Sequence, residues 1–185
     1  MSEMRYPYAE ALKVANEIVD TLMPACTHIE IAGSLRRERP DVGDIEILYI
    51  PRIEETDDPC DFFGKMELNR VDEKLEKLTG IFFERRLNIL GREVYGDKNK
   101  LMRHIKSGIP VDFFAATTEN WFNYLVCRTG PADSNKAICN AAIAKGLKWH
   151  PYGAGFSNGA GWMIVPSERA VFDFVGLPYK EPRDR

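Results

Sequence analysis

The sequence is poor in the residues that build zinc sites and disulfide frameworks. Its 185 residues include only four cysteines and three histidines, and the cysteines, Cys26, Cys60, Cys127 and Cys139, form no CxxC pair. Zinc sites and disulfide scaffolds need closely spaced or more numerous cysteines. We therefore expect free thiols and no zinc site.

Long apolar runs and a positive net charge are also missing. No apolar stretch approaches the roughly 20 residues that a membrane span needs, and residues 1–10 are polar where a signal peptide has an apolar core. We expect a cytoplasmic protein that is not secreted and has no membrane partner. The net charge of −3 means that any nucleic acid would be bound locally, because wholesale coating needs a basic surface.

One segment is locally basic. Between residues 85 and 106 only Glu93 and Asp97 oppose a group of basic residues, namely Arg85, Arg86, Arg92, Lys98, Lys100, Arg103 and Lys106. Such a segment fits a phosphate backbone or a solvated hairpin with ordinary surface charge, and the sequence leaves both interpretations open.

The apolar pattern predicts an α+β fold. Helical spacing indicates helices over 8–22, 68–78, 121–128, 135–145 and 168–175. Alternating or apolar runs indicate strands over 28–32, 44–50, 82–83, 100–105 and 109–115, and a hairpin over 147–165. Residues 51–64, rich in Asp, Glu and Pro, are predicted to form a loop. We place a mixed α/β lobe at 1–116 and a smaller α+β lobe at 117–185.

Helix ends and tryptophans carry further expectations. Asp133 or Ser134 is the predicted cap of the helix over 135–145. Ser167 is the predicted cap of the last helix, which should end at Gly176. Core packing is expected for the tryptophans other than Trp149, which lies with Tyr152 in the glycine-rich hairpin, where exposure is plausible.

Three acids are predicted to meet at one place. Alternate residues of a strand share a face, so Asp44 and Glu46 point the same way. Asp112 lies in an otherwise apolar strand, where a buried carboxylate needs a cation or an opening to solvent. Carboxylates are ligands that Mg²⁺ prefers, and paired ions can bind both the attacking and the leaving oxygen of a displacement. Alone, Asp44 and Glu46 would be better explained as the polar face of a half-exposed strand.

A glycine turn upstream of the acids favours phosphate binding. The chain has the segment Gly33-Ser34-Leu35-Arg36-Arg37 directly after a predicted strand. The lack of a side chain at Gly33 permits close approach, the amides of a helix start and the Ser34 hydroxyl can donate, and Arg37 adds a forked, charged contact. The ordered combination of this turn with the acid pair and the third acid is more specific than any one part.

These motifs resemble the nucleotidyltransferase superfamily, and within it the family X DNA polymerases of the DNA polymerase beta type. Gly33 to Arg37 with Gly43-Asp44-Ile45-Glu46 is similar to the triphosphate and metal motif, and Val111-Asp112-Phe113 to the third metal-ligand strand. The resemblance implies a nucleotidyltransferase palm followed by a small thumb. It is closest to the minimal viral members, which lack the lyase and helix-hairpin-helix domains, since nothing before Arg5 resembles those domains.

Further motifs extend the resemblance along the chain. Arg5-Tyr6-Pro7 resembles the segment whose arginine reaches the terminal phosphate of the nucleotide. Thr129-Gly130 with Asn135-Lys136 resembles the thumb motif that packs on the incoming sugar and base, which puts Asn135 at the minor-groove edge of the base. The ends 170–174 and 179–185 are similar to the family's closing helix and tail.

The resemblance implies a reaction and its cofactors. A hydroxyl would attack the α-phosphate of a nucleoside triphosphate, with Asp44, Glu46 and Asp112 holding two Mg²⁺ ions that Mn²⁺ may replace. Gly33, Ser34, Arg37, Gly43 and Arg5 would contact the phosphates, and Thr129, Gly130 and Asn135 the nucleoside. The expected partners are the nucleotide and a weakly held DNA primer and template, the expected state is a monomer, and the location is wherever the host or viral DNA lies.

Three functions remain open at this point. The first is a template-using DNA polymerase that fills short gaps in DNA repair. The second is a nucleotidyltransferase acting on a small molecule, a protein or an RNA end, which is consistent with Glu46, since DNA polymerases of this family usually carry Asp there. The third is an inactive nucleic-acid-binding module.

Overall fold

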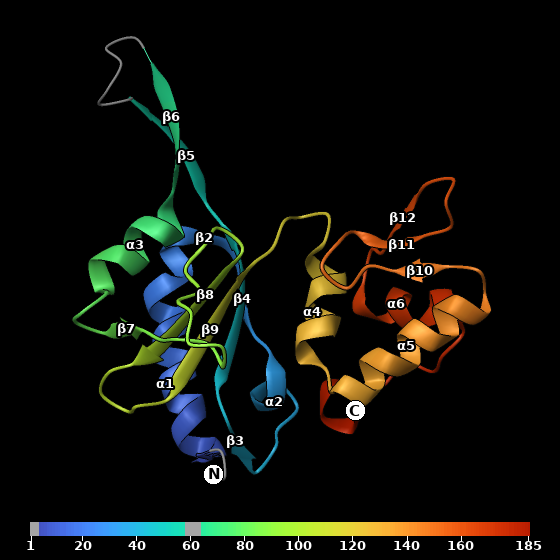
Figure 1. The fold of residues 1–185 in the computed structure, drawn as a ribbon, viewed down its shortest axis with the longest axis horizontal. Coiled ribbons are helices and arrows are strands. Elements are labelled where there is room, and N and C mark those ends of the chain that lie inside the picture. Colours follow the sequence, from blue (N-terminus) through green and yellow to red (C-terminus); the bar gives the residue numbers. More distant parts are fainter. Residues whose placement is uncertain (1–3, 58–63) are drawn as a thin grey trace.

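A five-stranded sheet forms the centre of the first lobe (Figure 1). In this computed structural model, which describes residues 4–57 and 64–185, the strand order is β2-β4-β9-β8-β7. Strands β4 and β9 are parallel, and the other neighbouring pairs of this sheet are antiparallel. The strands are β2 (Cys26–Ile31), β4 (Ile45–Pro51), β7 (Phe83–Arg85), β8 (Asn99–His104) and β9 (Pro110–Ala115). The predicted α+β class is confirmed.

Helix α1 (Tyr8–Leu22) covers one face of this sheet. Its buried residues recur every three or four positions, as the helical period requires, and are Ala11, Ala15, Ile18 and Leu22. They pack on alternate residues of the two central strands, namely Ile45, Ile47, Tyr49, Val111 and Phe113. Full burial of one such aliphatic side chain contributes about 1.5–3 kcal/mol. The residues between them, Glu46 and Asp112 included, therefore face the other side of the sheet.

The second lobe packs on that other face. Leu48 of β4 and Phe114 of β9 form a buried cluster with Trp121, Tyr124 and Leu125 of α4 (Trp121–Thr129). This cluster crosses the predicted boundary between residues 116 and 117. The division into two domains stays a prediction.

A third cluster holds the second lobe together. Its elements are α5 (Ala132–Ala144), β10 (Lys148–Trp149), β11 (Gly155–Ser157), β12 (Trp162–Ile164) and α6 (Glu168–Val175). The three strands form an antiparallel sheet. As predicted, the Ser167 side chain caps α6 by accepting from the N–H of Ala170, and Gly176 ends it in the left-handed conformation.

The environments of two tryptophans differ from the prediction. Trp149 is buried, because its indole Nε1 donates to Oδ1 of the buried Asn123 at 2.7 Å. Asn123 in turn donates to the carbonyl oxygens of His150 and Gly153. Trp162 is instead exposed, and Tyr152 is exposed as expected. The sequence could not show that a helix residue far away in the chain supplies the acceptor that a buried indole needs.

The loop predicted over 51–64 is partly wrong. Strand β5 (Ile53–Asp57) pairs with β6 (Lys65–Asn69) in an antiparallel ribbon that projects from the first lobe in Figure 1. Residues 58–63 lie outside the described residues. The helix predicted from residue 68 begins later, as α3 (Arg70–Leu78), because the side-chain oxygen of Asn69 caps it by accepting from Val71 and Asp72.

The predicted cap of α5 is also wrong. The helix begins at Ala132, directly after Pro131, and neither Asp133 nor Ser134 caps it. Pro131 itself is the N-cap residue, with an extended backbone and no side-chain cap hydrogen bond. The short elements are β1 (Tyr6–Pro7) paired with β3 (Asp41–Val42), the single turn α2 (Gly33–Arg36), and the 3-10 turns η1 (Met23–Ala25) and η2 (Pro182–Asp184).

Two absences can be stated for residues 4–57 and 64–185. Cys26, Cys127 and Cys139 are free thiols there, as predicted, while Cys60 lies outside this part of the chain. In the same residues, no helix combines the length and the apolar character that crossing a bilayer requires.

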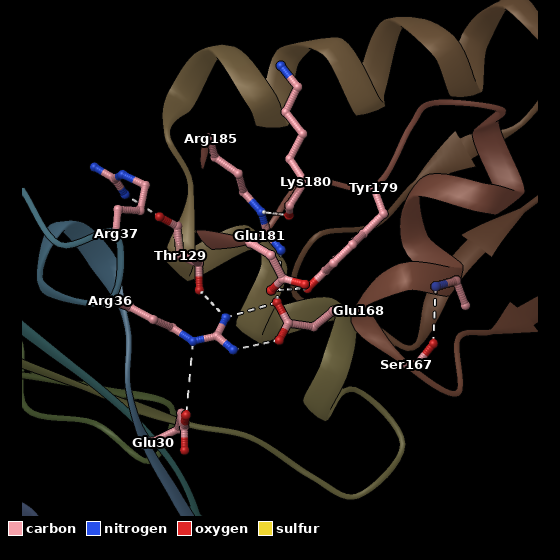
Figure 2. A network of polar contacts seen from close by, with 11 residues as sticks. Glu30, Arg36, Arg37, Thr129, Ser167, Glu168, Tyr179, Lys180, Glu181 and Arg185 are labelled. Carbon is pink, nitrogen blue, oxygen red and sulfur yellow. Dashed lines mark hydrogen bonds and ion pairs between the residues drawn. The ribbon is translucent and has the colours of Figure 1, made fainter. Parts of the chain in front are cut away.

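An ion-pair network joins α2 to the second lobe (Figure 2). The Arg36 guanidinium donates to both carboxylate oxygens of Glu168, at 2.9 and 2.6 Å, and to the Thr129 hydroxyl at 2.9 Å. Arg185 Nη2 lies 3.1 Å from the same carboxylate. Burial alone would raise the pKa of Glu168, but the hydrogen bonds and charges of Arg36 and Arg185 outweigh it and hold the pKa below its usual value. The glycine turn and the end of α4 are therefore tied together.

Replacing Glu168 tests this network. We expect Glu168→Gln to lower the free energy of unfolding at pH 7 by about 3 kcal/mol, because two mostly buried arginines lose their shared counter-charge. Since the folded-state pKa is depressed, the stabilisation exists above the ordinary pKa and is lost as the pH falls through the folded-state value. The difference between wild type and variant should therefore shrink as the pH falls below the ordinary glutamate pKa of about 4.3 toward the depressed folded-state pKa.

Urea unfolding followed by circular dichroism measures both effects. Asp133→Asn is the control, because its ion pair with Lys136 is almost fully exposed and should be worth little at any pH. An equal effect of the two substitutions at pH 7 would contradict the role given to Glu168.

Candidate active site

Glu46 and Asp112 lie directly beside each other. The parallel pairing of β4 with β9 puts Glu46 in register with Asp112, on neighbouring strands about 4.8 Å apart. Asp44 is not part of β4, which begins at Ile45, but precedes it by one residue. Its charge nevertheless reaches Glu46. Burial first, then the charge of Asp44, raises the pKa of Glu46 to about 8, and Asp112 adds to the rise.

Gly33 is placed against the Glu46 carboxylate. It begins α2 with a φ of +64°, and a Cβ atom added there would lie 2.1 Å from Glu46 Oε2. The positive φ favours glycine, since other residues rarely adopt it, and any added side chain would force the Glu46 carboxylate to move. The glycine predicted to permit close approach of a ligand therefore already admits a carboxylate of the protein itself.

Two arginines that the sequence did not assign to the acids contact them. Arg128, at the end of α4, lies 3.7 Å from Glu46 Oε1, and its guanidinium stacks 3.5 Å from the ring centroid of Phe114. Arg86 donates to Asp112 Oδ1. Burial raises the pKa of Asp112, and Arg86 opposes this. No sequence signal pointed to these pairs, because Arg86 and Arg128 are brought to the sheet from separate elements.

The predicted phosphate ligands lie at two places. Arg37 is within electrostatic range of Glu46 and Asp44, and its guanidinium donates to the backbone oxygen of Thr129. Burial, with a contribution from Arg39, lowers the pKa of Arg37. Ser34 lies next to Gly33 in the same turn of α2.

Arg5 and Gly43 form the second place. Arg5 Nε donates to Asp41 Oδ1 at 2.6 Å, and a Cβ added at Gly43 would lie 3.5 Å from Arg5 Nη1. Gly43 directly precedes Asp44, so Arg5 lies beside the residues that lead into the start of β4. The Arg5 side chain is half exposed, and so is its partner Asp41. An exposed ion pair is weak, so Arg5 could leave Asp41 for a ligand with little loss of stability.

The predicted nucleoside contacts lie in the second lobe. Thr129 is fully buried in the network of Figure 2, and Gly130 ends α4 with a φ of +62°. Asn135 on α5 donates to the carbonyl oxygen of Cys127 at 2.8 Å. Its Oδ1 is buried and has no hydrogen-bond partner among the described residues. One amide atom of Asn135 is thus engaged with α4, and the other still needs a donor.

A preformed three-ligand metal site is not seen. Across residues 4–57 and 64–185, no three His, Cys, Asp or Glu side chains are gathered closely enough to hold a metal ion. The donor set nevertheless fits a divalent cation, because carboxylate oxygens are its preferred ligands and the raised pKa of Glu46 reflects burial and negative charge that a cation would relieve. Ligation by Asp44, Glu46 and Asp112 stays a prediction.

Comparison with known proteins supplies the class. Residues 124–185 match the family described as DNA polymerase beta thumb, so the second lobe is a polymerase-type thumb. The chain is also 30% identical over 185 residues to the DNA polymerase/3′-5′ exonuclease PolX of Bacillus subtilis (strain 168), an alignment that covers 98% of this chain. The two likenesses together support a family X polymerase-like protein. It spans 28% of the length of that relative.

Substitution of Gly33 tests the contact with Glu46. We expect Gly33→Ala to cost more stability than Gly80→Ala, because Gly80 has a similar φ of +83° but nothing within 4 Å of an added Cβ. The positive φ alone costs about 1 kcal/mol at either position. A double-mutant cycle with Glu46→Ala, measured by urea unfolding, should recover the excess cost at Gly33. Equal costs at the two glycines would show that the contact is unimportant.

The raised pKa of Glu46 gives a second prediction. A carboxyl group whose pKa is raised on folding contributes stability that is complete below its ordinary pKa and is lost as the pH rises through the folded-state value of about 8. In EDTA, raising the pH from 5 to 9 should therefore destabilise the wild type relative to Glu46→Gln, by no more than about 5 kcal/mol.

Thermal unfolding with and without metal completes this test. Mg²⁺ or Mn²⁺ at pH 9 should restore stability to the wild type more than to Glu46→Gln, because a bound cation stabilises the ionised acids. A wild type that responds to neither ion would contradict metal binding at these residues.

Proposed function

We propose that this chain transfers a nucleotide from a nucleoside triphosphate to a hydroxyl group, with two Mg²⁺ ions that Mn²⁺ can replace. One observation carries the proposal: Glu46, two residues after Asp44 in the chain and against Gly33, stands in register with Asp112 on the adjacent parallel strand. The similarity to a DNA polymerase over the whole chain supports it.

Each residue receives a role from its position. When bound, the metal ions would neutralise charge on the attacking and leaving oxygens. Asp112 takes the proton of the attacking hydroxyl, a role that suits a carboxylate whose pKa is raised by burial. Arg37 and Ser34 hold the phosphates from the turn at α2, and Arg5 reaches them from the entrance to β4. Gly43 leaves room for the phosphates beside Arg5, and Gly33 leaves room for the Glu46 carboxylate next to the Ser34 hydroxyl.

The two internal ion pairs must open before the acids can act. Glu46 is paired with Arg128, and Asp112 with Arg86. Both arginines come from outside β4 and β9, so they can move without disturbing the register of the acids. Triphosphate and acceptor phosphates offer them new anionic partners. Binding of the substrate phosphates by Arg128 and Arg86 would thereby free the carboxylates of Glu46 and Asp112 from their ion pairs.

The nucleoside is assigned to the thumb. Thr129 and Gly130 end α4 beside Arg37, so a triphosphate held by Arg37 brings its sugar to this turn. The buried, unsatisfied Oδ1 of Asn135 is an acceptor that a nucleobase could supply with a donor. Rotation of this amide away from Cys127 would expose its own N–H groups to the base.

We propose DNA with a short gap as the acceptor, which would make the chain a template-using repair polymerase that holds its primer and template weakly. The polymerase relative supports this choice. Glu46 favours the alternative, a transferase for a small molecule, a protein or an RNA end. An inactive nucleic-acid-binding module is the second alternative. It is consistent with the ion pairs that Glu46 and Asp112 make with arginines of the chain.

A gap-filling assay separates these functions. Protein is incubated with a gapped duplex, each nucleotide and Mg²⁺ or Mn²⁺, and extension is followed by gel electrophoresis. We expect extension by the templated nucleotide. Asp44→Asn and Asp112→Asn should reduce it by a factor of about 1,000 or more, because several kcal/mol of charge stabilisation are lost, while unfolding curves show that the variants fold.

Two variants complete the design. Asp20→Asn makes the same chemical change on the exposed surface of α1 and should leave extension unchanged. Glu46→Asp compares acceptors: faster gap filling would indicate a polymerase limited by its glutamate, and slower gap filling a site built around it. Unchanged extension in both Asp44→Asn and Asp112→Asn would contradict the proposed function.

A further inference from the structure

Three large aliphatic side chains are exposed together in the segment between β7 and β8. Leu87, Ile89 and Leu90 have exposed fractions of 60%, 101% and 72%. We call residues 87–93 the aliphatic tip. Single exposed apolar residues are ordinary, but three within four positions form a patch of the kind that marks an interaction surface.

The aliphatic tip is held in one conformation by hydrogen bonds. The Asn88 side-chain oxygen accepts from the N–H of Leu90 at 2.9 Å and of Arg92 at 3.1 Å. The Asn88 N–H donates to the carbonyl of Arg92 at 2.8 Å, and Leu87 bridges to Glu93. The apolar side chains are therefore presented to solvent by an ordered turn, which lowers the entropy cost of binding.

The tip lies close to the proposed reaction site. Arg86, the residue before it, contacts Asp112, and Ile89 and Leu90 follow three and four residues later. Because an extended chain spans at most about 3.6 Å per residue, the Cα atoms of Ile89 and Leu90 lie within about 14 Å of the Cα atom of Arg86. In Figure 1 the segment crosses the near side of the sheet, whereas α1 lies behind it. The acids face the same side, opposite α1.

Charges around the tip favour a nucleic acid over a protein. Arg92 is exposed within the tip, Lys98 is exposed between it and β8, and Arg86 stands at its base. The neighbouring acids are Glu93, which is engaged by Arg85 at 2.9 Å, and the exposed Asp97. An apolar centre with cations beside it matches a duplex, in which stacked bases lie between two phosphate backbones.

We propose that the aliphatic tip is a wedge that enters the minor groove of a double-stranded acceptor, a few base pairs from its reacting 3′ end. Ile89 and Leu90 would press on the edges of the base pairs, and Arg92 would contact a phosphate. This inference rests on the proposed function, because it takes the acceptor to be a nucleic acid. With this wedge, the binding of the duplex depends more on apolar contacts than on the net charge of the chain.

Binding measurements without nucleotide test the wedge. Fluorescence anisotropy compares the wild type with the double variant Ile89→Ser/Leu90→Ser on a labelled gapped duplex. We expect at least about a tenfold loss of affinity from the two lost apolar contacts. Ile81→Ser is the matched control, because Ile81 is 79% exposed in the turn after α3 and outside the tip. It should bind like the wild type.

Salt dependence separates the apolar from the ionic contacts. Arg92→Gln should lower the slope of log K against log salt by about 1, since one phosphate contact is lost. The double variant should keep the wild-type slope. A 2-aminopurine base placed one to five positions from the 3′ end should brighten with the wild type at one position and not with the double variant, because the wedge unstacks it.

Several outcomes would overturn the wedge. They are wild-type affinity in the double variant, an equal loss in Ile81→Ser, or a wild type that binds no duplex. The first would leave the tip as a surface for another protein. Failure of the proposed function would look different. If the wild type transfers no nucleotide but still binds the duplex through the tip, the proposed function is wrong and the wedge stands. A double variant that binds and extends normally disproves the wedge alone.

Discussion

The parallel pairing of β4 with β9 is the constraint on which the candidate site depends. It puts Glu46 opposite Asp112 and, by alternation, turns both away from the core under α1. The neighbours Leu48 and Phe114 then receive α4 of the second lobe. One register therefore decides both where the acids gather and where the thumb is attached, and a slip of one residue would bury the acids under α1.

Arginines balance the charge that this register concentrates. Arg128 and Arg86 each contact one acid, and Arg36 joins α2 to Glu168 of the second lobe. The balance is incomplete at Glu46, whose pKa stays raised to about 8. Such an acid costs stability when ionised and is stabilised by a cation. A bound cation would relieve this negative charge, and the arginine pairs with Glu46 and Asp112 neutralise part of it in its absence.

Sequence patterns predicted the elements that have strong periodicity and missed those that depend on distant partners. Helices α1 and α6 followed from their apolar spacing and, for α6, from Ser167 and Gly176. The β5–β6 ribbon was missed because its residues are mostly polar and exposed. The burial of Trp149 depends on its hydrogen bond to Asn123, and the start of α3 depends on capping by Asn69. Local sequence patterns do not show which distant residue or which neighbouring residue will take these roles.

By itself the sequence was enough to predict a site at the three acids and the glycine turn and to show the resemblance to family X polymerases, because the order of motifs along the chain and the backbone freedom of glycine are local properties. Only the tertiary structure decided that Glu46 pairs with Arg128 and Asp112 with Arg86, and that an ordered aliphatic tip stands beside them. These contacts join residues dozens of positions apart, and nothing in local propensity records which charged side chains the folded chain brings together.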